Sequence, residues 1–171
     1  ISDKKVVIIR SYHYLLSGFI WRMVNMDTDT PARRGLDFEE RVRKFLTIAM
    51  GTKFLKKEML IKTSYDPIRH TFDLFAFNPK IIGEVKRYSW LKGRKFPPNE
   101  FEGIKQDLAL LQLSPVQDHR KVLILREDIS SEGKSLIDAF IKRLGKGQLL
   151  NGIEVWRYSQ GSTLEEDCVT Q

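Results

Sequence analysis

Residues 69–87 read Arg-His-Thr-Phe-Asp-Leu-Phe-Ala-Phe-Asn-Pro-Lys-Ile-Ile-Gly-Glu-Val-Lys-Arg, two apolar runs separated by Asn78 and Pro79. Asn followed by Pro is typical of a turn. The stretch therefore predicts a hairpin whose strands cover residues 69–77 and 80–87.

Two acidic residues fall on the two strands of this hairpin, Asp73 on the first and Glu84 on the second. In a strand, side chains two apart share a face, so Glu84 and Lys86 point the same way and Val85 points the other way. Two carboxylates that converge beside a lysine form a site for a hard divalent cation and a water molecule that it activates. The hairpin is therefore the candidate functional site.

Apolar periodicity and turn residues extend the prediction along the chain. Gly51 is predicted to end the first helix, Asn99 to cap the second and Gly145 to end the third. The predicted elements are strand 4–10, helix 36–50, strands 53–62, 69–77 and 80–87, helix 99–113, strand 120–126, a helix from Ser130 or Ser131 to Leu144, and strand 153–158. This order indicates an α/β fold with a central mixed sheet flanked by helices.

The chain has 171 residues, enough for a single domain with one core. We expect an N-terminal extension at 1–34 (a strand plus an aromatic-rich segment), a main domain at 35–160 and an acidic, disordered tail at 161–171. The single cysteine, Cys168, excludes an internal disulfide and favours an intracellular location, cytoplasmic or nucleoid-associated. No apolar run reaches the roughly 20 residues of a membrane span. The net charge of +7 favours a polyanionic partner.

The helix predicted at 36–50 carries two neighbouring acids, Glu39 and Glu40, in different surroundings. Its apolar stripe is formed by Phe38, Val42, Phe45, Leu46 and Ala49. Glu39 lies at the edge of this stripe, while Glu40 lies on the solvated face with Arg43. Because a carboxylate on the core side of a helix needs a cation or hydrogen-bond partners, Glu39 is a candidate third acid directed toward the sheet. The alternative is an interfacial glutamate that reaches water or pairs with a lysine.

A helix with an inward glutamate, a strand aspartate, a hairpin and a Glu-x-Lys strand together resemble the PD-(D/E)XK nuclease superfamily. The resemblance spans roughly residues 33–126, and residues 127–158 fit the usual closing helix and strand. The segment Arg33 to Glu39 is similar to the opening of archaeal Holliday junction resolvases and of Mrr-like restriction endonucleases, which share a glycine four residues before the helix glutamate. The resemblance implies a restriction-endonuclease-like core with the order α-β-β-β-α-β.

The same resemblance implies roles for individual residues. Lys86 orients or polarises the attacking water, and Gln106 is an accessory residue on the following helix. The implied ligands of Mg²⁺, for which Mn²⁺ can substitute, are Asp73, Glu84, Glu39 and the carbonyl oxygen of Val85. A second Glu-x-Lys string, Glu132-Gly133-Lys134, is set aside because it falls at a helix start and contains a glycine.

Residues 86–96 interleave five cations with three aromatic residues directly after the candidate site. Cations pair with phosphates, and aromatic rings stack on bases or wedge a duplex. We therefore predict contact with nucleic acid through Arg33, Arg34, Arg87, Tyr88, Trp90, Lys92, Arg94 and Lys95. The alternative is a solvated loop whose aromatic residues pack inward. His70, three positions before Asp73, falls on the opposite face of an ideal strand, so we expect it to be structural or to contact substrate.

These features predict a Mg²⁺-dependent endonuclease that hydrolyses phosphodiester bonds and leaves 5′-phosphate ends, of the restriction type or from a mobile element or virus. The choice of DNA over RNA rests on the resemblance alone. The alternatives are a Holliday junction resolvase and a non-catalytic nucleic-acid-binding module with a nuclease fold. A homodimer is expected because cutting two strands needs two sites, and the chain also suits a larger DNA-processing complex.

Overall fold

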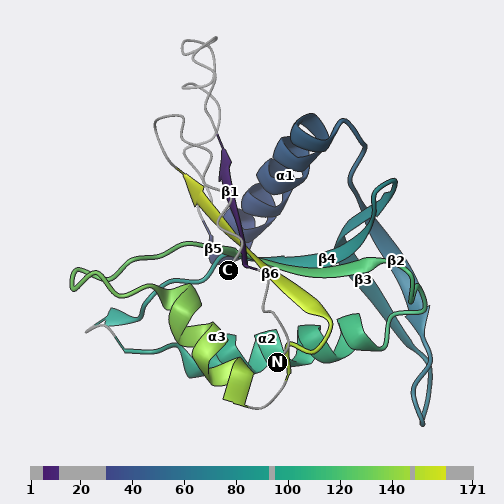
Figure 1. The fold of residues 1–171 in the computed structure, drawn as a ribbon. Coiled ribbons are helices and arrows are strands. Elements are labelled where there is room, and N and C mark those ends of the chain that lie inside the picture. Colours follow the sequence, from purple (N-terminus) through teal and green to yellow (C-terminus); the bar gives the residue numbers. More distant parts are fainter. Residues whose placement is uncertain (1–5, 12–29, 93–94, 147–148, 161–171) are drawn as a thin grey trace.

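The computed structural model describes residues 6–11, 30–92, 95–146 and 149–160, and Figure 1 draws the rest as a grey trace. Several predictions of the sequence therefore lie outside the described residues. They concern the aromatic-rich part of the N-terminal extension, Arg94 in the basic loop, and the acidic tail with Cys168.

The described elements form one mixed sheet with helices on both faces (Figure 1). In chain order they are β1 (Val6–Ser11), α1 (Pro31–Met50), β2 (Leu55–Ile61), β3 (Ile68–Phe77), β4 (Lys80–Lys86), α2 (Pro98–Gln112), β5 (Arg120–Arg126), α3 (Leu136–Lys146) and β6 (Ile153–Gln160). The six strands lie in the order β1-β6-β5-β4-β3-β2. β2, β3 and β4 pair antiparallel, whereas β4, β5, β6 and β1 pair parallel. The predicted α/β class with a mixed sheet flanked by helices is confirmed.

The helices divide the core into two layers. α1 covers one face of the sheet, and α2 and α3 cover the other (Figure 1). The α1-side core contains Phe38, Val42, Leu46, Leu74, Ile81, Val85, Val122, Ile124, Trp156 and Tyr158. The core on the other side contains Phe72, Phe75, Ile82, Ile104, Leu108, Leu123, Leu125, Ile137, Phe140 and Val155. α2 and α3 share a face because both crossovers join neighbouring parallel strands in the same direction with the same handedness.

The N-terminal strand joins the main sheet. β1 pairs in parallel with β6, from Val6 opposite Val155 to Ser11 opposite Gln160. Part of the segment predicted as an extension at 1–34 therefore completes the sheet of the main domain. Among the described helices, none combines the length and the apolar character that crossing a bilayer requires.

All three described helices begin at residues other than those predicted. α2 starts at Pro98, and Pro97 before it makes no side-chain capping hydrogen bond, so the predicted cap at Asn99 is wrong. α1 starts at Pro31, five residues early, because Thr30 caps it: the Thr30 Oγ1 accepts a hydrogen bond from Arg33 N at 3.2 Å. α3 starts at Leu136, after both predicted serines, because Ser135 Oγ accepts from Asp138 N at 3.2 Å. The predicted end of the first helix at Gly51 is confirmed, since this glycine adopts the left-handed conformation. The predicted end of the third helix at Gly145 is wrong, because α3 continues through this residue to Lys146.

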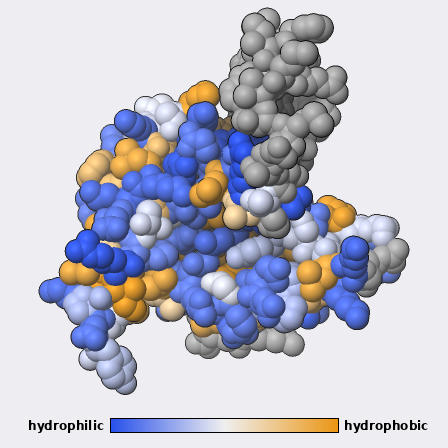
Figure 2. Space-filling model, turned by 180° about the vertical axis from the view of Figure 1, so that it is seen from behind, coloured by the Kyte–Doolittle hydropathy of each residue, from blue (hydrophilic) through white to orange (hydrophobic). Residues whose placement is uncertain are grey.

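The surface of the described part is mostly hydrophilic on the side opposite to that of Figure 1. Figure 2 shows hydrophilic residues across the centre of this side and hydrophobic residues in small separate groups nearer its edges. Exposed hydrophobic residues include Ile48, Tyr65 and Phe77. Isolated apolar residues of this kind are ordinary on a protein surface.

Gly83 marks the closest approach of β4 to β5. A Cβ atom at this position would lie 2.4 Å from Cγ2 and 2.6 Å from the carbonyl oxygen of Val122. Gly83 precedes Glu84 and pairs with Leu74, so the close contact lies directly beside the candidate site. The glycine therefore lets the two central strands pack at the point where the acids are presented.

We expect Gly83→Ala to lower the free energy of unfolding by about 1–3 kcal/mol, because the added methyl group forces β4 and β5 apart. Chemical denaturation followed by circular dichroism measures the change. Gly35→Ala is the matched control: a Cβ on Gly35 of α1 meets nothing within 4 Å. It should stabilise the protein by up to about 1 kcal/mol through helix propensity. Equal stability of the two variants would contradict the steric account.

Candidate active site

A bulge in β3 places Asp73 at the fork of the hairpin, the point where β3 and β4 stop pairing and separate. Lys57 pairs with Phe72 but Leu55 pairs with Phe75, so β3 carries one extra residue between these two pairs. The ladder between β3 and β4 runs only from Phe77 to Leu74, and there the two strands separate. Bulges of this kind bend a strand and redirect side chains, and they are common beside active sites.

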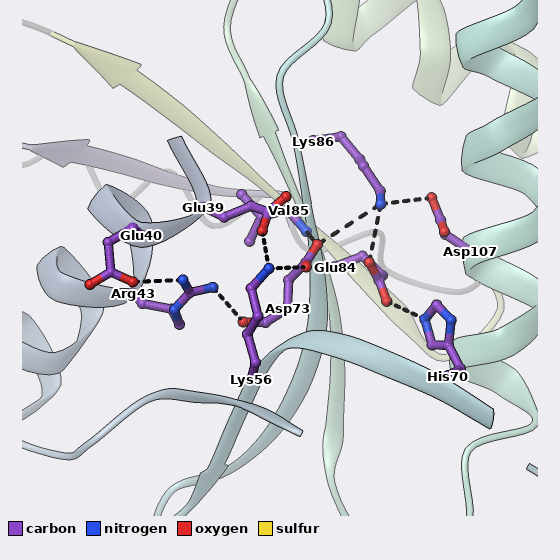
Figure 3. Close-up of polar contacts among 10 residues, drawn as sticks. All are labelled: Glu39, Glu40, Arg43, Lys56, His70, Asp73, Glu84, Val85, Lys86 and Asp107. Atoms are coloured by element: carbon purple, nitrogen blue, oxygen red, sulfur yellow. Dashed lines mark hydrogen bonds and ion pairs between the residues drawn. The ribbon is translucent and has the colours of Figure 1, made fainter. Parts of the chain in front are cut away.

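The carboxylate of Asp73 continues the contact between the strands where the ladder stops. Val85 N donates a hydrogen bond to Asp73 Oδ2 at 3.1 Å, in place of a bond to a backbone carbonyl. The side chain of Val85 is buried in the α1-side core, as its alternation with Glu84 and Lys86 predicts. Asp73 is thereby held in one orientation by the backbone of the strand that carries Glu84 (Figure 3).

Lys86 lies among three carboxylates (Figure 3). Its Nζ is 3.2 Å from Glu84 Oε2, 3.9 Å from Asp73 Oδ2 and 3.3 Å from Asp107 Oδ2 on α2. Burial alone would lower the pKa of Lys86, but the charges of Glu84, Asp107 and Asp73 outweigh it and raise the pKa above its ordinary value. Lys86 is therefore an ammonium ion at neutral pH.

The surroundings of Asp73 disfavour its charged form, whereas those of Lys86 favour the charged form of the lysine. Burial raises the pKa of Asp73 to about 6, and repulsion from the neighbouring carboxylate of Glu84 adds to the effect. Lys86 and the Val85 N–H act in the opposite direction but do not cancel the shift. Because Lys86 Nζ lies within 4 Å of both carboxylates, Asp73 and Glu84 lie close together at this ammonium group.

His70 lies beside Glu84, although an ideal strand would direct it away from the acids. Its Nε2 is 2.7 Å from Glu84 Oε1, and this hydrogen bond raises the pKa of His70 although burial opposes the shift. The bulge at Asp73 shifts the alternation of β3 by one residue, so His70 reaches the face of Glu84. Glu84 thus has a partner on each oxygen, His70 on one and Lys86 on the other (Figure 3).

Glu39 contacts a lysine rather than the other acids. Lys56 Nζ is 2.5 Å from Glu39 Oε2 and 3.8 Å from Asp73 Oδ1, so it stands between the two carboxylates (Figure 3). Glu39 does face the sheet, as its helical position predicts, and pairing with a lysine was the alternative for this residue. Lys56 lies on β2 directly opposite the bulge, which explains its reach.

Arg43 joins α1 to the same bulge. Its Nη1 donates to the backbone oxygen of Asp73 at 3.2 Å, and its Nη2 is 2.6 Å from Glu40 Oε2. The side chain of Arg43 is 12% exposed, so the prediction that it lies with Glu40 on a solvated face is wrong for the arginine. Arg43 therefore fixes the backbone of Asp73, while Val85 N fixes its carboxylate.

The helix α2 contributes Asp107, which the sequence prediction missed, while Gln106 is exposed. Asp107 lies three residues after Ile104 and four before Leu111, both of which are buried in the core. It therefore sits at the edge of an apolar stripe, the same signal that identified Glu39 on α1. Burial raises the pKa of Asp107, and Lys86 opposes this shift.

The aromatic residues of the basic loop pack inward. Tyr88, Trp90 and Phe96 lie against the core on the α2–α3 side. The ring of Phe96 lies edge-on to Phe140 with 5.2 Å between their centroids. Among the described cations of this loop, Lys92 and Lys95 are exposed. The placement agrees with the solvated-loop alternative for the aromatic residues and leaves the cations available for an anionic partner.

The carboxylate oxygens of this site are ligands that suit a hard cation. In this structure the ammonium groups of Lys56 and Lys86 lie between these carboxylates. Within the described residues, no group of three His, Cys, Asp or Glu side chains is arranged to hold a metal ion. Asp73 and Glu84 supply adjacent carboxylate oxygens, which suit Mg²⁺ or Mn²⁺. Glu39 would join them only if Lys56 moved from between Glu39 and Asp73.

Comparisons of the chain with protein-family models, with curated proteins and with solved structures find no match.

The raised pKa of Asp73 predicts how metal-free protein responds to pH. Since the folded-state pKa of about 6 exceeds the ordinary value of 3.8, ionisation costs the folded state stability as the pH rises from about 4 to 6. The loss is on the order of 3 kcal/mol. We expect Asp73→Asn to flatten this part of the profile and to raise stability at pH 8 in EDTA, measured by urea unfolding.

Asp37→Asn controls for the loss of one negative charge, because Asp37 is an exposed residue of α1. A profile for Asp73→Asn that fell between pH 4 and 6 as steeply as the wild-type profile would show that burial does not destabilise the Asp73 carboxylate.

The position of Lys56 predicts that it competes with divalent cations. We expect Lys56→Ala to tighten Mn²⁺ binding about tenfold, because the ammonium between Glu39 and Asp73 is removed and the site becomes more negative. Isothermal calorimetry measures the affinity. Lys57→Ala, at the next and exposed position of β2, should leave it unchanged. Weaker Mn²⁺ binding in Lys56→Ala than in wild type would show that Lys56 supports the cation site instead.

Proposed function

We propose that this protein is a Mg²⁺-dependent endonuclease that hydrolyses phosphodiester bonds in DNA, built on a PD-(D/E)XK-like core. The observation that carries the proposal is the position of the Lys86 ammonium within 4 Å of Asp73 and Glu84 at the fork of the hairpin. A second support is the element order from α1 to β5, which reads α-β-β-β-α-β. A metal-dependent nuclease needs converging acids and a nearby cation, and this arrangement supplies both.

Lys86 works as a fixed positive charge in this proposal. Its raised pKa keeps the proton on Nζ, so Lys86 donates hydrogen bonds and does not act as a general base. Asp107 and Glu84 hold the ammonium from two sides. In this position Lys86 orients a water molecule or an oxygen of the scissile phosphate, where negative charge develops during hydrolysis.

Asp73 and Glu84 would hold the metal ion, with the Val85 carbonyl and Glu39 as further ligands. A bound Mg²⁺ would offset charge on the phosphate and lower the pKa of its water. Asp73 is fixed by Val85 N, and Arg43 fixes its backbone, so its orientation is set before any cation binds. His70 holds one oxygen of Glu84 and leaves the other facing Lys86. Such partners orient ligands and raise metal affinity.

A non-catalytic nucleic-acid-binding module is the second candidate. It is favoured by the pairing of Glu39 with Lys56 and of Glu84 with Lys86, because these ion pairs balance the acids without any metal. Calorimetry separates the two candidates: a module of this kind would bind neither Mg²⁺ nor Mn²⁺. A nuclease would bind at least one of them.

Cleavage of supercoiled plasmid tests the proposed activity. Wild-type protein should nick or cut the plasmid with Mg²⁺ and not with EDTA, and Asp73→Asn and Lys86→Ala should lower the rate at least about 100-fold. Asp73→Asn is used because an amide oxygen can still accept from Val85 N. Parallel reactions on a four-way junction and on a matched linear duplex show which DNA geometry is the substrate.

Glu132→Ala and Lys134→Ala provide the matched control. They alter the second Glu-x-Lys string, which lies in a surface turn where Gly133 has a positive φ. These variants should cut as fast as the wild type. Full cleavage by both Asp73→Asn and Lys86→Ala would overturn the assignment of the site.

A further inference from the structure

A group of three arginines lies at the end of the sheet where β4 and β5 finish. Lys86 pairs with Leu125 in the parallel ladder, so Arg87 and Arg126 follow as neighbours just beyond. Both continue the alternation of the α1-side core, since Val85 and Ile124 belong to that core. The two arginines therefore face α1, on the side of the sheet opposite to Lys86. Arg41 on α1 completes the group, which we call the arginine cluster.

The arginine cluster is a concentration of positive charge. Burial lowers the pKa of Arg126, and the charges of Arg87 and Arg41 lower it further, with Asp128 opposing them. Asp128 Oδ1 is 3.7 Å from Nη2 of Arg126, but the other oxygen of Asp128 is occupied by a hydrogen bond from Trp90 N at 2.7 Å. The carboxylate that faces Arg126 is thus partly committed to another residue.

Arg126 has unused hydrogen-bonding capacity in this cluster. Its Nη2 donates to Ser89 Oγ at 2.6 Å, whereas its Nε is buried and has no partner among the described residues. A buried donor without a partner is costly, and a bound anion beside the guanidinium would offset part of this cost through its charge. Guanidinium groups match the geometry of phosphate oxygens with two parallel bonds.

We propose that Arg41, Arg87 and Arg126 form a subsite for a non-scissile phosphate of the DNA backbone. This inference rests on the proposed function, because it assigns the phosphate to the DNA strand that the nuclease cuts. Lys86 and Arg87 are consecutive, so the chain presents one cation to each face at the same end of the sheet. A DNA strand that crosses this end of the sheet meets the carboxylates on one face of the sheet and the arginine cluster on the other. The subsite positions the strand and takes no part in bond cleavage.

Binding without cleavage tests the subsite. Fluorescence anisotropy with a labelled duplex in EDTA gives the dissociation constant over a range of salt concentrations. We expect Arg126→Gln to weaken binding several-fold at low salt and to reduce the slope of log affinity against log salt by about one, because one phosphate contact is lost. Arg87→Gln should act in the same way, and it keeps the test valid if Arg126→Gln fails to fold.

Arg120→Gln is the matched control, because β5 begins with Arg120 and ends with Arg126. Arg120 pairs with Glu154 at the opposite end of the strand, with 2.8 Å between Nη2 and Oε2. This variant should bind the duplex as the wild type does. Wild-type affinity and salt slope in both Arg87→Gln and Arg126→Gln would overturn the subsite.

Kinetics with Mg²⁺ distinguish positioning from catalysis. Arg126→Gln should raise KM for DNA with little change in kcat, whereas Lys86→Ala should lower kcat. A fall in kcat alone for Arg126→Gln would overturn the positioning role. A wild-type protein that binds DNA through the arginine cluster but never cuts would refute the proposed function and leave the subsite intact.

The ligand could also be free phosphate, and thermal unfolding in EDTA separates the two sources. Inorganic phosphate at matched ionic strength should raise the melting temperature of the wild type no more than that of Arg126→Gln. Stabilisation of the wild type alone, together with unchanged DNA affinity in the variant, would assign the arginine cluster to free phosphate and overturn the DNA subsite.

Discussion

The site depends on one electrostatic constraint, the Lys86 ammonium held among the carboxylates of Glu84, Asp73 and Asp107. Removing one partner from a fully buried ion pair typically costs about 3–5 kcal/mol, and less where, as for Lys86, 22% of the side chain is exposed. The lysine joins β4 to α2 and brings acids from three elements together. The three carboxylates keep Lys86 protonated, while burial and the neighbouring charge of Glu84 raise the pKa of Asp73 to about 6.

The bulge in β3 is the backbone feature that makes this arrangement possible. It ends the β3–β4 ladder at Leu74, turns Asp73 toward Val85 N and brings His70 to Glu84. Lys56 lies opposite the bulge and occupies the space between Asp73 and Glu39. A regular hairpin would continue to pair the backbones of the two strands at this point. The local loss of ladder hydrogen bonds is offset by the side-chain contacts of Asp73 and His70.

The proposed cleavage site and the proposed phosphate subsite lie on opposite faces of the sheet. Glu84 and Lys86 face α2, where Asp107 holds the ammonium, and the arginine cluster faces α1. Strand alternation puts consecutive residues on opposite faces, so one strand end serves both sites. Gly83 permits the close packing of β4 and β5 that brings these strand ends together. In our proposal one site cuts the DNA strand while the other holds it in place.

The sequence by itself determined the hairpin, the α/β class and the convergence of Asp73 and Glu84, because turn residues and apolar periodicity act over short distances. It missed Asp107 and misplaced His70, and it began the third helix too early, before the cap at Ser135. These details depend on a one-residue bulge and on contacts between elements far apart in the chain. Only the tertiary structure decided them, since a shift of one residue in register reverses the face of every side chain before it.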